Sequence, residues 1–253
     1  MMQLNDFIRN ILNLLGYSIL KLNNYEKKMA DLKWLKLLNY FCGDKNVEDY
    51  KSQFGQDIFV LSQSNFKKNG FFVEFGATDG VSISNTYVLE KEFGWRGILV
   101  EPAKSWHKSL RENRNSIVDE RCVWSASKES LDFRETNNHE LSTIDTYSSL
   151  DMHTNARKSG RVYQVETISL LDLLTEHNAP KEIDYLSIDT EGSELAILQN
   201  FDFNRYNIRI ITVEHNFTEM REKIFELLTS HGYKRVFVEV SEVDDWYIKT
   251  VFS

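Results

Sequence analysis

The chain of 253 residues is 42% hydrophobic and 27% charged, with 30 basic and 38 acidic side chains and a formal net charge of −8. This balance argues against a nucleic-acid binder with a broad basic face, because phosphate contacts require clustered Lys and Arg side chains. The length is sufficient for one large domain with a hydrophobic core, together with an extension.

Residues 1–45 differ from the rest and are predicted to form a helical extension. Apolar residues recur there at steps of three and four, as expected for one stripe of a helix: Leu4, Ile8, Ile11, Leu15, Ile19 and Leu22. A shorter helix is expected between Trp34 and Phe41. The first forty residues carry six basic and three acidic side chains. Packing on the main domain or self-association as a homodimer is favoured over peripheral contact with an anionic membrane, because this positive charge is thin.

The sequence also indicates the compartment. The amino-terminal residues lack a basic segment followed by an apolar run, so no cleaved secretion signal is expected. No stretch approaches the roughly 20 apolar residues of a transmembrane helix. The two cysteines, Cys42 and Cys122, supply neither a disulfide scaffold nor a spaced zinc site. We therefore expect a cytoplasmic protein with reduced cysteines and no transmembrane segment.

From residue 46 to the C-terminus the pattern alternates between strands and helices. Strands are predicted at 71–75, 97–101, 121–124, 162–167, 183–189 and 208–214. Helices are predicted at 85–93, 104–113, 169–177, 193–200 and 217–230. The segments 233–240 and 246–251 flank a polar turn, which favours an antiparallel hairpin. Strands separated by helices predict an α/β fold with a doubly wound, mostly parallel sheet.

Two segments in the middle of the chain are less regular. Residues 131–133 are apolar enough to suggest a hairpin with the strand at 121–124. Residues 135–160 are polar and show no periodicity, so we expect a long loop, which in a compact domain is usually functional or mobile. The histidines of this loop, His139 and His153, are candidates for contact with a substrate.

The first chemical motif is the turn from Glu74 to Gly80, directly after an apolar strand. Its two glycines, Gly76 and Gly80, let the backbone turn sharply and approach a ligand closely. The spacing is not that of a dinucleotide fingerprint, and no Lys–Ser/Thr pair indicates a phosphate loop. The acidic Glu74 and Asp79 disfavour a pyrophosphate and tolerate a cationic cofactor.

The second motif is Glu101, at the end of the next predicted strand and before Pro102. A carboxylate on the order of 20 residues after a Gly-containing turn can accept hydrogen bonds from both hydroxyls of a ribose. An adenosine-bearing, positively charged ligand held by such a turn and carboxylate points to S-adenosyl-L-methionine.

A third group of carboxylates follows the strand at 183–189. Glu194 can complement the dipole of the next helix. Asp189 and Glu191 are harder to explain structurally, because like charges placed together cost stability unless a cation, a proton or hydrogen bonds offset them. We expect these two to face the sulfonium and the hydroxyl of the acceptor.

The strand at 208–214 ends in a fourth motif, Glu214–His215–Asn216. His215 is a candidate general base with a pKa near neutrality, or a hydrogen-bonded structural histidine. Asp189, Glu191 and Glu214 could together bind a divalent metal through carboxylate oxygens. Since the sequence shows no spaced ligand set, no metal is predicted.

Together these motifs resemble the FkbM family of S-adenosylmethionine-dependent methyltransferases. The resemblance covers roughly four-fifths of the chain, from about Ser52 onward, and its most distinctive part is the segment 184–194. The motifs that carry it are residues 52–57, 70–80, 84–86, 99–102, 183–194 and 213–216. The resemblance implies a Rossmann-like methyltransferase domain at 46–253 and, most often, O-methylation of a sugar or a secondary metabolite.

The resemblance also implies roles for individual residues. Glu101 would hold the ribose, and Pro102 and Ser125 would border the adenine. The other expected cofactor contacts are Gln53, Gln56, Glu74, Gly76, Ala77, Thr78, Asp79, Gly80, Asn85 and Thr86. From the chemistry of methyl transfer, rather than from the resemblance, we expect His215 or Glu191 to take the proton of the acceptor hydroxyl and Asp189 to orient donor and acceptor.

The sequence is compatible with three functions. An O-methyltransferase acting on a sugar, a glycan or a small metabolite is favoured. A methyltransferase acting on a protein or a nucleic acid is the second, and the acidic charge weighs against nucleic acid. The third is a non-catalytic interaction protein that retains the fold, against which the glycines and carboxylates of the cofactor site argue.

Overall fold

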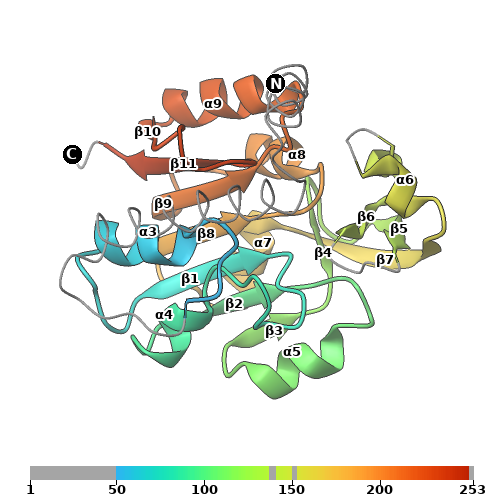
Figure 1. The fold of residues 1–253 in the computed structure, drawn as a ribbon, viewed down its shortest axis with the longest axis horizontal. Helices are drawn as coiled ribbons and strands as arrows, with labels where there is room; N and C mark the ends of the chain where they lie inside the picture. Colours follow the sequence, from blue (N-terminus) through green and yellow to red (C-terminus); the bar gives the residue numbers. More distant parts are fainter. Residues whose placement is uncertain (1–49, 137–140, 150–152, 251–253) are drawn as a thin grey trace, which may run out of the picture. The chain divides into compact units, whose positions relative to one another are not determined.

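The computed structural model describes residues 50–136, 141–149 and 153–250 (Figure 1). The predicted helical extension at 1–45 and His139 lie outside the described residues. The domain boundary between residues 45 and 46 therefore stays a prediction.

Seven strands form the main sheet, in the order β10-β11-β9-β8-β1-β2-β3. Their bounds are β1 Phe71–Phe75, β2 Arg96–Val100, β3 Ile117–Asp119, β8 Glu182–Ile188, β9 Asn207–Glu214, β10 Tyr233–Val236 and β11 Asp244–Lys249. Strands β3, β2, β1, β8 and β9 pair in parallel. The chain leaves β1 toward β2 and β3 and later returns on its other side through β8. Ligands bind at this kind of reversal in doubly wound sheets.

Helices precede, connect or follow the strands of the main sheet. They are α3 Gln56–Gln63, α4 Tyr87–Lys91, α5 His107–Asn113, α7 Leu170–Glu176, α8 Glu194–Gln199 and α9 Met220–Ser230. Ser169 starts α7, because its hydroxyl accepts a hydrogen bond from the Asp172 amide at 3.1 Å. The elements agree with the predicted alternation, although several helices are shorter than predicted.

The alternation of side chains along β1 and β8 separates core from site. Val73 and Phe75 belong to one apolar cluster with Leu186 and Ile188 and with apolar residues of α7, α8 and α9. Because successive strand residues point to opposite faces, Glu74 and its neighbour Ser187 project to the other face. The polar side chains near the strand ends are therefore placed by the same pattern that forms the core.

A second sheet of four strands, in the order β4-β7-β5-β6, corrects two predictions. Its strands are β4 Cys122–Trp124, β5 Ser130–Glu135, β6 Thr143–Ile144 and β7 Arg161–Ser169. The predicted hairpin between 121–124 and 131–133 is wrong, because β7 lies between β4 and β5. The described part of 135–160 is also more ordered than the predicted loop. It contains β6, the 3-10 helix η2 Asp145–Tyr147 and the helix α6 Thr154–Arg157.

The third strand of the main sheet is β3, rather than the predicted segment at 121–124. After β3 the chain turns: the Asp119 carboxylate accepts a hydrogen bond from the Arg121 amide at 3.0 Å and pairs with the Arg121 guanidinium. The next residues then form β4, which pairs with β7. Strands of three residues are too short for periodicity to assign them to a sheet.

The C-terminal hairpin is confirmed: β10 pairs with β11, and β11 pairs with β9, both antiparallel. The predicted α/β fold with a doubly wound, mostly parallel sheet is thereby confirmed as well. Among the described residues, no helix combines the length and apolar character needed to cross a membrane.

Candidate active site

A pocket with about 780 Å³ of space, open to solvent, lies where β1, β2 and β8 end. We refer to it as the first pocket. The residues predicted from the sequence that line it are Glu74, Gly76, Thr78, Asn85, Glu101, Pro102, Asp189 and Glu191. The Gly-containing turn and the acidic strand end thus meet in one pocket, as the sequence predicted.

Glu101 is joined directly to the turn. Its Oε2 accepts a hydrogen bond from the Thr78 amide at 2.9 Å, and its Oε1 accepts one from the Ala103 amide at 2.8 Å. Burial raises the pKa of Glu101 to about 7; the two amides oppose this shift, and the Asp189 and Glu135 carboxylates add to it. The group is therefore poised to change charge near neutral pH.

Gly76 is required by a close approach of two strand ends. It has a φ of +73°, and a Cβ atom built there would lie 2.2 Å from the carbonyl oxygen of Asp189. No side chain fits such a gap. Glycine at this position therefore lets β1 and β8 end side by side and brings Asp189 to the wall of the first pocket.

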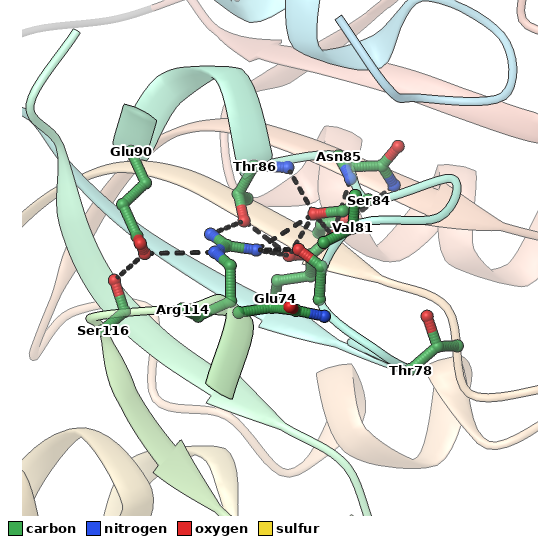
Figure 2. A network of polar contacts seen from close by, with 12 residues as sticks. Glu74, Thr78, Val81, Ser84, Asn85, Thr86, Glu90, Arg114 and Ser116 are labelled. Atoms are coloured by element: carbon green, nitrogen blue, oxygen red, sulfur yellow. Dashed lines mark hydrogen bonds and ion pairs between the residues drawn. The ribbon is translucent and has the colours of Figure 1, made fainter. Parts of the chain in front are cut away.

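The guanidinium of the buried Arg114 binds several residues in and after the turn (Figure 2). Its Nη1 donates to the Gly80 carbonyl and to Ser84 Oγ, each at 3.1 Å, and its Nη2 donates to Thr86 Oγ1 at 2.9 Å. It also pairs with Glu90 at 3.2 Å and lies 3.7 Å from Glu74. Sequence reasoning missed Arg114, because a single arginine 34 residues after Gly80 offers no spacing signal.

Glu74 is bound into the same network. Its carboxylate accepts hydrogen bonds from the Asn85 amide at 2.7 Å and from the hydroxyls of Ser84 and Thr86. Burial raises the pKa of Glu74, and Arg114 opposes that shift. Glu74 therefore fixes the segment 84–86 at the pocket wall.

Asn85 lines the first pocket and has one hydrogen-bonding atom without a described partner. Its Nδ2 donates to Ser187 Oγ at 2.9 Å. Its Oδ1 is buried, and no donor of the described residues lies within hydrogen-bonding distance. A buried acceptor without a donor costs free energy, so this atom fits a ligand that donates a hydrogen bond, such as an ammonium group.

Other predicted cofactor residues support the turn without lining the pocket. The Ala77 amide donates to the carbonyl of Val100 at 3.2 Å, and the Asp79 carboxylate accepts hydrogen bonds from the amides of Val81 and Ser82. A Cβ atom at Gly80 would lie 2.6 Å from Arg114 Cγ. Ala77, Asp79, Gly80 and Thr86 thus shape the turn.

The structure does not bring Gln53, Gln56 or Ser125 to the first pocket. Gln53 is exposed, and the buried Gln56 donates to Asp244 at 2.6 Å. Ser125 follows β4, which belongs to the second sheet, so the premise that it ends the third strand of the main sheet is wrong. Cys122 and Val123 of β4 line the pocket instead.

Carboxylates gather next to the first pocket. One oxygen each of Asp189, Glu191 and Glu214 lies within 4.8 Å of the others. Arg157 Nη2 lies 2.8 Å from Glu191 Oε2, and Asn216 Nδ2 donates to the same oxygen at 3.3 Å. Burial, and then Asp189 and Glu191, raise the pKa of Glu214 well above its ordinary value.

A second pocket, with about 980 Å³ of space, adjoins this cluster. Glu191 lines both pockets, and the second is also lined by Glu214, His215, Phe217 and Tyr147. Phe217 is 61% exposed. The cluster therefore lies at the junction of two pockets, one of which offers aromatic side chains.

The geometry of His215 does not favour it as a general base. Its Nδ1 accepts a hydrogen bond from the Phe217 amide at 3.0 Å, which places the proton of the neutral ring on Nε2. Nε2 lies 3.7 Å from Asp245, and His215 does not line the first pocket. Burial lowers the pKa of His215 to about 4, so the ring is neutral at pH 7. His153 lies at the start of α6.

Comparison with known proteins identifies the class to which this α/β fold and its first pocket belong, that of the methyltransferases. The profile of the methyltransferase FkbM domain matches residues 74–235. The chain belongs to this family, and it is an S-adenosylmethionine-dependent methyltransferase with S-adenosyl-L-methionine as its cofactor. No protein of curated function matches the sequence.

Two solved structures are similar at low identity. A precorrin-6y C5,15-methyltransferase from Geobacter metallireducens GS-15 has 14% identity and a TM-score of 0.40, over 76% of this chain and 85% of its own. A TehB-like SAM-dependent methyltransferase from Corynebacterium glutamicum ATCC 13032 has 8% identity and a TM-score of 0.39, over 90% of this chain and 100% of its own. At this distance neither structure bears on the acceptor.

Replacing Arg114 with Met should lower the free energy of unfolding by about 3–5 kcal/mol, because it leaves Glu74 and Glu90 buried without their cation. Urea denaturation measures this. The control is Arg111→Met in α5, the helix that Arg114 follows, at a side chain 57% exposed. It should lower the free energy of unfolding by less than about 1 kcal/mol. Equal costs for the two variants would contradict the role given to Arg114.

The titration of Glu101 should be visible in the stability of the cofactor-free protein. Its pKa is raised to about 7, so protonation favours the folded state, and this stabilisation is lost as the pH rises through 7. The free energy of unfolding of Glu101→Gln, minus that of the wild type, should therefore increase by about 2–3 kcal/mol from pH 5 to pH 8. A difference that does not change with pH would contradict the assignment.

Proposed function

We propose that the protein transfers a methyl group from S-adenosyl-L-methionine to a hydroxyl group of a sugar, a glycan or a small metabolite. One observation carries the proposal. Asp189 and Glu191 line the pocket that contains Glu101, and Glu191 also lines the second pocket. A sugar hydroxyl is weakly acidic, so its methylation benefits from a carboxylate base placed between donor and acceptor.

The residues of the first pocket fit the cofactor. Glu101 would hold the ribose hydroxyls, and Pro102 would border the adenine. Asn85 Oδ1, the buried acceptor without a described donor, fits the ammonium of the methionine moiety. When bound, the cofactor would supply a methyl group on a positively charged sulfur. The acceptor oxygen would bond to the methyl carbon, and the electron pair of the broken C–S bond would stay on sulfur.

Glu191 is proposed to take the proton of the acceptor hydroxyl. Arg157 at 2.8 Å and Asn216 at 3.3 Å orient its carboxylate. Asp189, whose backbone is fixed against Gly76, would position the reacting groups. His215 is left out of this proposal, because Nδ1 is occupied by a backbone amide and Nε2 lies toward Asp245.

The second pocket supports a small neutral acceptor. Its wall carries the carboxylates of Glu191, Glu194 and Glu214, which would repel phosphates of nucleic acids or nucleotide sugars. Tyr147 and the exposed Phe217 offer aromatic surface to the apolar face of a sugar ring. A protein acceptor and a non-catalytic role are outcomes that the experiments below distinguish.

Replacing Glu101 with Ala should weaken binding of S-adenosylhomocysteine at least tenfold, because two hydrogen bonds to a charged group are lost. Titration calorimetry measures the affinity. The matched control is Glu129→Ala, an exposed position outside both pockets, which should bind as the wild type does. Equal affinity of Glu101→Ala and wild type would refute the ribose assignment, and no binding by wild type would refute the enzyme.

Replacing Glu191 with Gln should reduce kcat about 10²- to 10⁴-fold, the range for loss of a general base, while S-adenosylhomocysteine binding changes little. The assay follows labelled methyl groups from the cofactor onto free glycans, nucleotide sugars and small metabolites. The label should appear in a product that resists proteases and nucleases and contains a methyl ether. Label found solely on protein or nucleic acid would replace this proposal with the corresponding alternative.

A further inference from the structure

Three carboxylates from two neighbouring strands converge at the junction of the two pockets. Asp189 directly follows β8, Glu191 lies two residues further along, and Glu214 is the last residue of β9. One oxygen of each lies within 4.8 Å of the others. Asp189 and Glu191 line the first pocket, and Glu191 and Glu214 line the second. Any ion between them would touch both pockets.

Glu214 is buried, and its carboxylate has no described hydrogen-bond donor or cation. The residue is 8% exposed, and no described residue donates a hydrogen bond to its carboxylate or pairs with it as a cation. After burial, the strongest electrostatic influences on it come from carboxylates, those of Asp189, Glu191, Glu194 and Asp244. A buried carboxylate in such surroundings is costly unless a ligand compensates its charge.

Unlike Glu214, the neighbouring carboxylates of Glu194 and Glu191 have hydrogen-bond donors or a cation. Glu194 Oε1 accepts hydrogen bonds from the Thr190 amide, the Thr190 hydroxyl and the Gly192 amide, all at 2.9–3.0 Å. Glu191 is paired with Arg157 at 2.8 Å. Arg157 therefore offsets the charge of Glu191, while Glu214 lacks a comparable cation among the described residues.

We propose that Asp189, Glu191 and Glu214 bind a divalent cation of the Mg²⁺ or Mn²⁺ type. Both are hard cations that prefer carboxylate oxygens. Both bind six ligands, so three carboxylates leave positions for water or for hydroxyl groups of the acceptor. No nitrogen or sulfur ligand belongs to the cluster, which favours these cations over zinc.

The cation would select and activate the acceptor, and this part of the inference rests on the proposed function. Neighbouring hydroxyls of a polyol would occupy adjacent positions of its coordination sphere. Coordination makes a hydroxyl more acidic. The proton then passes to a carboxylate oxygen that does not hold the cation, the oxygen–methyl bond forms, and the electron pair of the methyl–sulfur bond stays on sulfur.

Binding of Mn²⁺ to the metal-free full chain tests the site without cofactor, acceptor or turnover. Electron paramagnetic resonance of free Mn²⁺ should show one site per chain in the wild type. Glu214→Gln should weaken that site at least tenfold, and Glu112→Gln, at a side chain 66% exposed on α5, should leave it unchanged. No Mn²⁺ binding by wild type, or equal binding by Glu214→Gln, would overturn the proposal.

Thermal unfolding provides a second measurement. Mn²⁺ should raise the Tm of the wild type and of Glu112→Gln but not that of Glu214→Gln. In the absence of metal, Glu214→Gln should unfold at a higher temperature than the wild type, because glutamine neither carries the charge that the neighbouring carboxylates repel nor needs a proton to neutralise it. A lower Tm without metal would show that the Glu214 carboxylate stabilises the fold by itself and would overturn the proposal.

The same proteins separate this inference from the proposed function. If S-adenosylhomocysteine binds and hydroxyl acceptors are methylated while Mn²⁺ does not bind, the metal site fails and the function stands. If Mn²⁺ binds as expected but no hydroxyl acceptor is methylated, the function fails and the metal site stands.

Discussion

The first pocket depends on the buried pairing of Arg114 with Glu74 and Glu90. Arg114 reaches from the end of α5 and binds the Gly80 carbonyl, while Glu74 binds the segment 84–86 from the end of β1. Both sides of the turn are thereby fixed by one charged network. A buried ion pair contributes little net stability by comparison with apolar packing, so its value here lies in holding one geometry, since removing either partner leaves a buried charge.

That fixed turn explains how Glu101 is controlled. The Thr78 amide reaches Glu101 because Thr78 has a left-handed φ of 47° within a turn that Arg114 holds in place. Two amide donors favour the carboxylate form and burial favours the neutral form, so the pKa lies near 7. Ligand hydroxyls that donate to the carboxylate would favour the charged form further. With Glu101 holding the ribose, as proposed, cofactor binding and the ionisation of Glu101 would be thermodynamically linked.

Features fixed by position at a strand end could be predicted from the sequence. Gly76, Glu101 and Asp189 each follow or end a clearly apolar strand, and parallel strands bring such residues to one edge. Features set by long-range contacts could not. The pairing of Asn85 with Ser187 spans 102 residues, and Arg114 has no periodic signal. Ser125 was misplaced because β3 and β4 each have three residues, so the sequence alone did not reveal which strand joins the main sheet.

The carboxylates at the two ends of the site are treated differently by the fold. On the first-pocket side, Glu74 and Glu101 each accept hydrogen bonds from backbone amides, so that end is organised before any ligand binds. At the junction with the second pocket, Glu214 is surrounded by other carboxylates and receives no such donor from the described residues. Preorganisation lowers the cost of binding a rigidly held ligand. Where a charge is left uncompensated, binding of a cation or a proton lowers the free energy of the site. The first-pocket end is therefore preorganised, and the proposed cation would complete the junction with the second pocket.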